Sequence, residues 1–558
     1  MRTRLTFMLV ALPLLAAHSQ SRVTIERVAP KQWRATYHLT APSRELRFDR
    51  PASFFRERVW KVTTPGYQLG RSGDRQIVTL AAGRTARSDI TFEFGEFTDA
   101  LPKEYELFQS FTDGGLAIYT GHFHLRSVTA TGHDTVRVSS IRIVTPQGAH
   151  AIVRGKIVTG TATLTDSAGD NGTYVYIGKQ KPIETPDVVA VIDPGLPPWI
   201  RTMFDQRLPA LFHEYAARIG SVLPWKPVVL FGYDTAGTGL SSGGGTLTGL
   251  VNMTVTGAAW QTETSHAAEQ AFHLIAHESA HLWNGQLVHN VMSGPGEWLH
   301  EGSADALANE MMRAFGVIDT ARYRARKEEA LNRCLSAIGA TSVEAAFRRG
   351  AAVYDCGFAL SLWTEAAMNT VNNRANLFTF WRALVDTAKH HGQKYSDTTY
   401  FSVLSAAGVP DSVTSRMRAF LVAQSDGGAA LIGGLVAAGI PLRAGTGTPP
   451  APYQMDAARA ALVHLMGTTC GRVSIYWGPI PRTGAVPTCP PFAKELLIAR
   501  VSGQRVRDQG AALYDSVRSA CAAGQPVTLE DDKGAPLANI PCTKALPALS
   551  PWYEIGPF

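Results

Sequence analysis

The segment HESAHLWNGQLVHNVMSGPGEWLHEGSAD, residues 277–305, holds the pattern from which the fold and chemistry of this chain are inferred. His277 and His281 are four residues apart, so a helix places both imidazoles on one face, one turn apart. Two imidazoles at this spacing can bind one zinc ion, and Glu278 points beside that ion, within reach of a water molecule. The preceding residues are good helix formers without proline, which predicts a helix that begins near Ser265 as its N-cap.

A third ligand has to come from farther along the chain. Glu301 lies in a second helical pattern, EWLHEGSADALANEMMRAFG, with Gly316 as its stop signal. Nineteen residues separate His281 from Glu301, enough for a helix end, a Gly-Pro-Gly loop and a return. Glu301 can therefore complete a His2Glu zinc site. Three other residues of the segment are alternative third ligands: Glu297, His289 and His300.

Two further residues can support the ligands. Asp305 lies four residues after Glu301, so both can face the same way on a helix. Its carboxylate can accept the spare N–H of a zinc-bound imidazole and fix the tautomer, although it can also be a plain solvent-facing residue. His273, one turn before His277, is interpreted as a supporting or packing residue, because the metal has to lie between His277 and His281.

The N-terminus predicts export. Arg2 and Arg4 precede a short apolar run, Leu5–Ala17, and a small-x-small cleavage site follows, which is typical of a signal peptide over residues 1–19. The alternatives are an N-terminal anchor or a buried strand. The run is short for a membrane span, and no later run of about 18 apolar residues appears. We therefore expect a periplasmic or extracellular protein with no stable membrane anchor.

Charge and cysteine content narrow the class further. The formal net charge is +7, with the basic residues scattered, which favours a solvated surface over a nucleic-acid interface. The six cysteines are even in number and none forms a C-x-x-C pair, so disulfides are favoured over zinc fingers. Connectivity does not follow from the sequence. The simplest prediction pairs Cys334 with Cys356 and the other four cysteines within the C-terminal region.

With 558 residues, of which 45% are hydrophobic and 18% charged, the chain can form two to four globular domains. Residues 20–185 contain alternating runs such as ITFEFGEF, TVRVSSIRIV and TYVYIG, which predict a β-sandwich. Residues 186–425 are mostly helical, with the strands KPVVLFGYD and LVNMTV on either side of a glycine-rich loop, SSGGGTLTG. Residues 426–452 read as a linker, and residues 453–558 as a small mixed α/β domain.

These motifs resemble a known class of enzymes. HESAHLWNGQLV followed by EWLHEG is similar to the gluzincin metallopeptidases, and in particular to the aminopeptidase N and glycyl aminopeptidase families. The gap of nineteen residues is the thermolysin-type spacing, whereas the aminopeptidase N family has eighteen. The resemblance implies a thermolysin-like catalytic domain over residues 186–425, zinc ligands at His277, His281 and Glu301, and a catalytic carboxylate at Glu278.

The resemblance extends beyond the zinc segment. VYDCGFALSLWTE is similar to a stretch of the aminopeptidase N family whose tyrosine donates to the transition-state oxyanion, which implies that role for Tyr354. Cys356 stands where that family has lysine, and a buried core tyrosine is the alternative for Tyr354. The tail from Leu496 resembles the second half of a PDZ domain, with strand, turn, strand, helix and hairpin in order.

The sequence thus predicts a multidomain α+β protein that hydrolyses peptides or proteins with Zn²⁺. Two alternatives stay open: a binding protein with a vestigial zinc site, and a zinc hydrolase of non-peptide substrates. The aminopeptidase families bind the free amine of the substrate through a glutamate on a strand before the zinc helix. Here no acidic residue occurs between Asp234 and Glu263, which favours cleavage that tolerates a blocked N-terminus, unless Glu297 takes that place.

Overall fold

The computed structural model describes residues 20–51, 54–99, 101, 104–129, 135–138, 140–165, 171–292, 294–339, 341–348, 350, 352–471, 473–477 and 480–556. The predicted signal peptide, residues 1–19, lies outside this range. The chain divides into two compact units, residues 1–182 with 193–195, and residues 183–192 with 196–558. None of the helices in the described part combines the length and apolar composition that a membrane crossing requires.

The first unit is built from two β-sheets that share one apolar core. Alternation explains its strands: in β6 (Arg87–Gly95) the side chains of Ile90, Phe92 and Phe94 are buried and those between them are more exposed. The larger sheet contains β1 (Arg22–Ala29), β2 (Gln32–Phe48), β3 (Trp60–Val62), β4 (Tyr67–Ser72), β5 (Arg75–Leu80), β6, β9 (Leu125–Thr129), β10 (Thr135–Arg137), β11 (Ser140–Val144) and β14 (Thr161–Thr165). The smaller sheet contains β7 (Phe108–Ser110), β8 (Leu116–Tyr119), β12 (His150–Val153), β13 (Lys156–Thr159) and β15 (Tyr174–Gly178).

The second unit begins with a mixed sheet in the order β16-β17-β18-β20-β19. Its strands are β16 (Ile183–Glu184), β17 (Val189–Ile192), β18 (Val228–Asp234), β19 (Ser241–Leu247) and β20 (Leu250–Thr256). β17, β18 and β20 are parallel, whereas β19 runs antiparallel to β20 and forms the edge. The glycine-rich stretch predicted as a loop is therefore a strand. That prediction was wrong, because glycines tolerate a strand at an edge where the partner strand supplies the hydrogen bonds.

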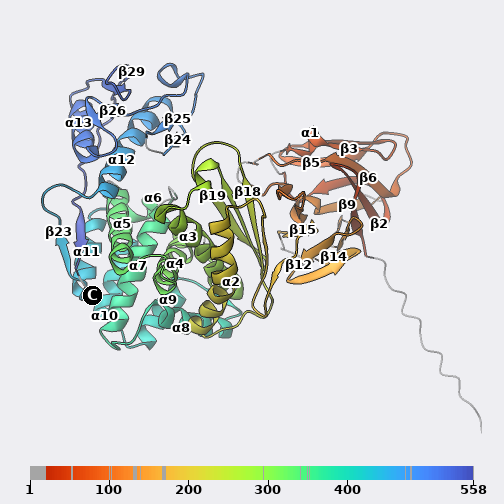
Figure 1. The fold of residues 1–558 in the computed structure, drawn as a ribbon, viewed down its shortest axis with the longest axis horizontal. Helices are drawn as coiled ribbons and strands as arrows, with labels where there is room; N and C mark the ends of the chain where they lie inside the picture. Colours follow the sequence, from red (N-terminus) through yellow and green to blue (C-terminus); the bar gives the residue numbers. More distant parts are fainter. Residues whose placement is uncertain are drawn as a thin grey trace, which may run out of the picture. The chain divides into compact units, whose positions relative to one another are not determined.

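Helices follow this sheet along the chain. Figure 1 shows α3, α4, α5 and α7 side by side next to the sheet. They are α2 (Pro198–Ile219), α3 (Ser265–His281), α4 (Ser303–Ala314), α5 (Thr320–Ile338), α6 (Val343–Arg348), α7 (Ala352–Asn369), α8 (Leu377–His390), α9 (Asp397–Ala406), α10 (Asp411–Leu421) and α11 (Gly427–Ala437). α2 ends at Gly220, which adopts a left-handed φ of 73°.

The C-terminal region follows without an extended linker. Residues 426–452, expected to be a linker, contain α11 and β23 (Leu442–Ala444), which pairs with β30 (Tyr553–Ile555). Beyond them lie α12 (Ala451–Cys470), α13 (Gly510–Ala522) and a sheet in the order β27-β26-β28-β29. These strands are β26 (Arg500–Val501), β27 (Gln504–Arg505), β28 (Val527–Glu530) and β29 (Pro536–Ile540). Strand, strand, helix and hairpin therefore follow in the expected order.

The predicted disulfide pairing is confirmed. Cys334 on α5 bonds to Cys356 on α7, and the tail contains the pairs Cys470–Cys489 and Cys521–Cys542. The first bond joins two helices of the helical part, as expected. Three disulfides suggest an oxidising compartment.

Candidate metal centre

Helix α3 supplies the two histidines. Its N-cap is Thr264, one residue before the predicted Ser265. The hydroxyl of Thr264 accepts from the backbone N–H of Ala267. The apolar face of α3 is buried in the core, and His277 and His281 lie one turn apart, each only 7% exposed. Sequence spacing and helix geometry therefore place the two imidazoles as predicted.

Glu301 comes from η6 (Trp298–Gly302), a π-helical turn that leads into α4. Two glycines allow η6 to approach α7 closely: a Cβ on Gly302 would lie 2.3 Å from the backbone of Gly357. Larger residues would force the two elements apart. This contact brings Glu301 close to Tyr354, which is three residues before Gly357.

The three candidate ligands converge. His277 Nε2 and His281 Nε2 are 3.0 Å apart, and Glu301 Oε2 lies 3.4 Å and 3.3 Å from them, respectively. Atoms about 2.0–2.1 Å from a tetrahedral zinc ion lie about 3.3 Å from one another. The spacing and the nitrogen–nitrogen–oxygen donor set both fit zinc.

The outer nitrogens of both imidazoles already have partners. Asp305 Oδ1 accepts from His277 Nδ1 at 2.8 Å, and Asn284 Oδ1 accepts from His281 Nδ1 at 3.0 Å. Asn284 is itself buried and donates through Nδ2 to the carbonyl of His300. These bonds fix the tautomers so that both Nε2 lone pairs point at the space beside Glu301.

Electrostatics also favour a cation here. Burial lowers the pKa of the His277 imidazole, but Asp305 and Glu301 outweigh it and raise that pKa to about 10. Burial raises the pKa of both carboxyls, yet neighbouring histidines hold them well below their usual range: His277 and His273 for Asp305, and His277 and His281 for Glu301. Two ionised carboxylates in a buried site attract positive charge, whether it comes from protons or from a metal ion.

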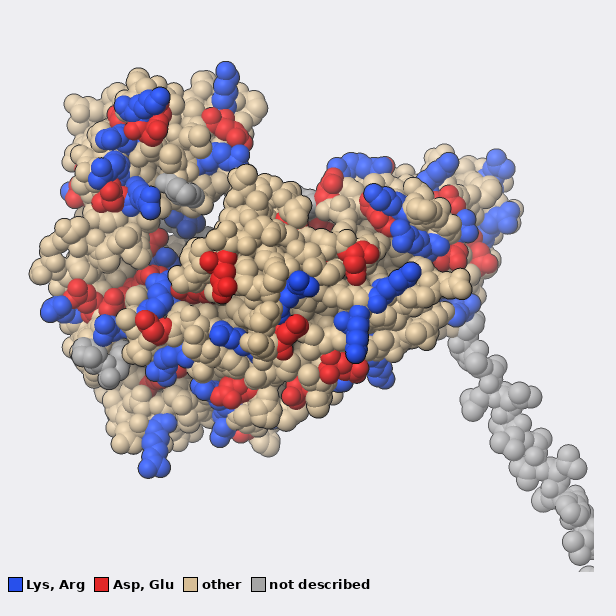
Figure 2. Space-filling view, in the orientation of Figure 1, with Lys and Arg blue, Asp and Glu red and all other residues tan. Residues whose placement is uncertain are grey.

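Glu278, the predicted catalytic carboxylate, follows the first histidine and is 8% exposed. Its Oε2 accepts from the hydroxyl of Thr246 on β19 at 2.8 Å. The edge strand of the sheet therefore lies against the zinc helix at this carboxylate. Figure 2 shows a surface without Lys, Arg, Asp or Glu over the region of β19, whereas basic and acidic side chains are intermixed elsewhere on this face.

Tyr354 borders the same site. Its side chain is 39% exposed, and its ring stacks on His277 with centroids 6.0 Å apart. The alternative of a buried core tyrosine is therefore wrong. Burial and the nearby carboxylates, Glu301 foremost, raise the pKa of Tyr354, so the phenol keeps its proton and can donate it in a hydrogen bond.

None of the alternative ligands belongs to a set of three converging ligand atoms in the described residues. His300 stacks on His281 with centroids 4.1 Å apart, and burial together with His281 lowers its pKa to about 3, so it stays neutral. His273 Nε2 is 3.1 Å from Asp305 Oδ1, which agrees with a supporting role. Glu297 and His289 are exposed, and neither belongs to a set of three ligand atoms within 4.8 Å in the described residues.

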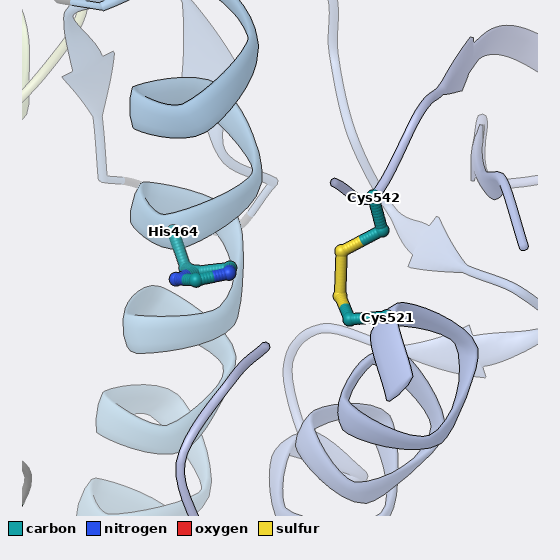
Figure 3. Close-up of side chains that lie close together, drawn as sticks. All are labelled: His464, Cys521 and Cys542. Carbon is teal, nitrogen blue, oxygen red and sulfur yellow. A yellow bond between two sulfur atoms is a disulfide. The ribbon is translucent and has the colours of Figure 1, made fainter. Parts of the chain in front are cut away.

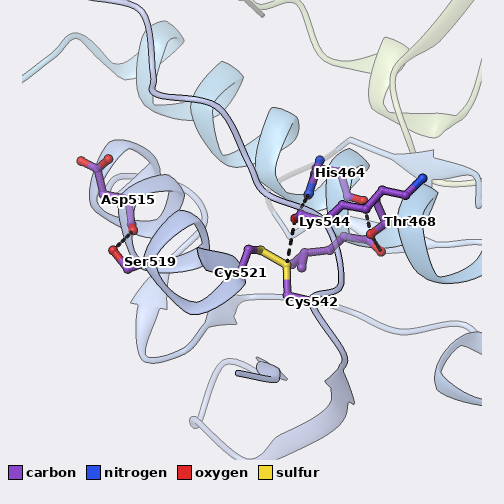
Figure 4. The surroundings of a disulfide bond; sticks show 8 residues. His464, Thr468, Asp515, Ser519, Cys521, Cys542 and Lys544 are labelled. Carbon is purple, nitrogen blue, oxygen red and sulfur yellow. Dashed lines mark hydrogen bonds between the residues drawn. A yellow bond between two sulfur atoms is a disulfide. The ribbon is translucent and has the colours of Figure 1, made fainter. Parts of the chain in front are cut away.

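A second set of ligand-type side chains lies in the tail. His464 on α12 faces Cys521 on α13 and Cys542, which follows β29 (Figure 3). The two sulfurs are bonded to each other, and His464 Nε2 lies 3.0 Å from the carbonyl oxygen of Lys544 (Figure 4). Disulfide sulfurs are not thiolates, so this set does not offer a metal site.

Sequence reasoning missed two residues of the centre. Asn284 stands three residues after His281, a spacing that brings the two together on a helix, and that signal was overlooked. Thr246 is 32 residues before Glu278, on a stretch interpreted as a loop. Nothing local in the sequence indicates that contact.

No protein-family model and no curated protein matches the sequence. Among solved structures, an aminopeptidase N family protein from Idiomarina loihiensis is similar over 96% of this chain and 98% of its own, with a TM-score of 0.60 and 12% identity. The chain shares its fold. An M1 zinc metallopeptidase from Deinococcus radiodurans (15% identity, 78% of this chain and 94% of its own, TM-score 0.40) and yeast LTA4 hydrolase (12% identity, 80% and 72%, TM-score 0.44) also match.

Proposed function

We propose that this protein is an exported zinc-dependent metallopeptidase. The observation that carries the proposal is the convergence of His277, His281 and Glu301 on one point, with Glu278 beside it. A purely structural zinc site needs no further carboxylate next to its ligands, whereas hydrolysis needs a general base. The fold shared with an aminopeptidase N family protein supports the same conclusion.

In this proposal His277, His281 and Glu301 hold the zinc, while Asp305 and Asn284 keep the two imidazoles oriented. When bound, zinc supplies Lewis-acid activation of a water molecule and of the scissile carbonyl. The buried carboxylates and fixed tautomers mean that little reorganisation accompanies metal binding.

Two side chains of this protein carry out the proton transfer and stabilise the oxyanion. Glu278 accepts a proton from the attacking water and later delivers it to the leaving amine. Tyr354, protonated and exposed at the edge of the site, donates a hydrogen bond to the oxyanion of the tetrahedral intermediate. The net reaction is hydrolysis of an amide bond.

The proposed substrate is an extended peptide that lies along β19. This strand pairs only with β20 among the described strands, so its outer edge can bind peptide main chain. No acidic residue occurs from Thr235 to Thr262, so β19 itself offers no carboxylate to a free amine. We therefore propose that cleavage tolerates a blocked N-terminus.

The domain assignment is part of the proposal. Residues 20–185 form a β-sandwich domain, residues 186–425 the thermolysin-like catalytic domain and residues 453–558 a PDZ-like domain that follows the connecting residues 426–452. The order of strands and helix in the tail supports the last assignment.

Digestion of a peptide library by the purified protein, with and without chelator, tests this function by mass spectrometry. We expect chelator-sensitive cleavage, restored by added zinc, and equal cleavage of free and N-acetylated forms of one peptide. Loss of cleavage on acetylation would make the protein an aminopeptidase. Tight zinc binding without hydrolysis of any peptide would favour a binding protein or a hydrolase of another substrate.

A further inference from the structure

Alternate residues of the edge strand β19 face the zinc helix. Ser242 Oγ accepts from Gln270 Nε2 at 2.8 Å, and a Cβ on Gly244 would lie 3.6 Å from Cγ of Glu278. Thr246 comes next with the same orientation, as the period of two in a strand requires. Through these alternate residues the strand contacts α3 from Gln270 to Glu278.

The hydroxyl of Thr246 reaches two oxygens of Glu278. Oγ1 lies 2.8 Å from the carboxylate oxygen Oε2 and 2.6 Å from the main-chain carbonyl oxygen, so its single proton is shared between the two acceptors. Among the hydrogen bonds found in the described residues, it is the one side-chain donor to this carboxylate. Glu278 Oε1 remains for the attacking water.

The position of Thr246 is itself fixed. Gln286, one turn beyond the zinc helix in η4 (Leu282–Leu287), donates to the carbonyl of Leu247 and accepts from the backbone N–H of Gly249 at 2.7 Å. The oxygen and the nitrogen of the Gln286 amide therefore both bind the turn between β19 and β20. A hydroxyl on such a tied hairpin is a rigid support rather than a mobile contact.

We infer that Thr246 is a positioning residue that fixes the orientation of the Glu278 carboxylate. A glutamate side chain has three rotatable bonds, and its carboxylate acts as a base only when one oxygen faces the water at hydrogen-bond distance. By holding Oε2, Thr246 leaves Oε1 as the carboxylate oxygen that can accept from the water. The inference rests on the proposed function in so far as it assigns a purpose to this orientation.

Three variants test the role of the hydroxyl. Thr246→Val keeps the shape and removes the donor, and Thr246→Ser keeps the donor. The matched control is Thr387→Val on α8, which removes a hydroxyl that donates to the carbonyl of Ala383. We expect Thr246→Val to lower kcat about 10- to 100-fold with little change in KM, zinc content or Tm. Thr246→Ser and Thr387→Val are expected to stay within about threefold of the wild type.

Crystal structures of Thr246→Val and of the wild type give a readout that does not depend on turnover. We expect the carboxylate of Glu278 to be rotated or disordered in the variant and ordered in the wild type. An ordered, unrotated Glu278 in Thr246→Val, or an unchanged kcat, would overturn the inference. If the wild type itself fails to cleave peptides, the proposed function fails, while the orientation of Glu278 still decides the role of Thr246.

Discussion

The candidate metal centre and the tail contain similar side chains at similar distances. The ligand atoms of His277, His281 and Glu301 lie within 4.8 Å of one another, and so do those of His464, Cys521 and Cys542. In the first set, hydrogen bonds hold the outer nitrogens, while the inner nitrogens face one another and Glu301 Oε2. In the second, the two sulfurs are already bonded to each other. The bonds that donor atoms already make, and not residue type or proximity, distinguish a metal centre from a cluster.

The largest expected effect is the loss of hydrolysis in a variant of Glu278 that still binds zinc. Glu278→Gln keeps the shape of the side chain, and its amide oxygen can still accept the hydrogen bond from Thr246. The amide cannot take a proton from water. We expect hydrolysis to fall by about 10³-fold or more, with zinc content and fold unchanged. Steady-state kinetics and elemental analysis on one preparation check this. Undiminished turnover would remove the proposed mechanism.

The oxyanion donor is the next test. Tyr354→Phe removes one hydroxyl at the exposed edge of the site and leaves the stacking of the ring on His277. We expect kcat to fall about 10²- to 10³-fold, because the lost bond forms mainly in the transition state, with KM little changed. An unchanged kcat would show that Tyr354 only packs beside the ligand.

The tail set can be tested by opening its disulfide. The double variant Cys521→Ser, Cys542→Ser removes a crosslink between residues 21 apart in the sequence. We expect the free energy of unfolding of the tail to fall by about 3 kcal/mol, and zinc content to stay as in the wild type. Denaturant unfolding and elemental analysis measure the two effects. Loss of zinc from this variant would place a metal in the tail and break the comparison.

The smallest expected effect is a loss of zinc affinity when the hydrogen-bond acceptors of the two imidazoles are removed. Asp305→Ala and Asn284→Ala each remove the acceptor of one Nδ1–H. We expect each to weaken zinc affinity about 10- to 100-fold, measured by competition with a chelator. His464→Ala, which removes a histidine of the tail set, is the matched control and is expected to leave affinity unchanged. Equal affinity in all three variants would contradict the role of the outer bonds.

The parts of the centre that the sequence predicts are those set by local geometry. The spacing of His277 and His281 follows from the helix, and Glu301 from a second helical pattern at a suitable distance. Neighbouring cysteines paired as expected. The edge strand β19 was misinterpreted, because three consecutive glycines indicate a loop unless a partner strand supplies the hydrogen bonds. The contact of Thr246 with Glu278 depends on tertiary packing alone, so no local pattern reveals it.

The zinc content of the wild type and two glutamate variants tests the central claim most directly. Glu301→Ala removes the proposed third ligand, and Glu297→Ala removes an exposed carboxylate four residues earlier. After dialysis against a weak chelator, elemental analysis is expected to find about one zinc per chain in the wild type and in Glu297→Ala, and almost none in Glu301→Ala. Zinc retained in Glu301→Ala but lost from Glu297→Ala would contradict the ligand set on which the account depends.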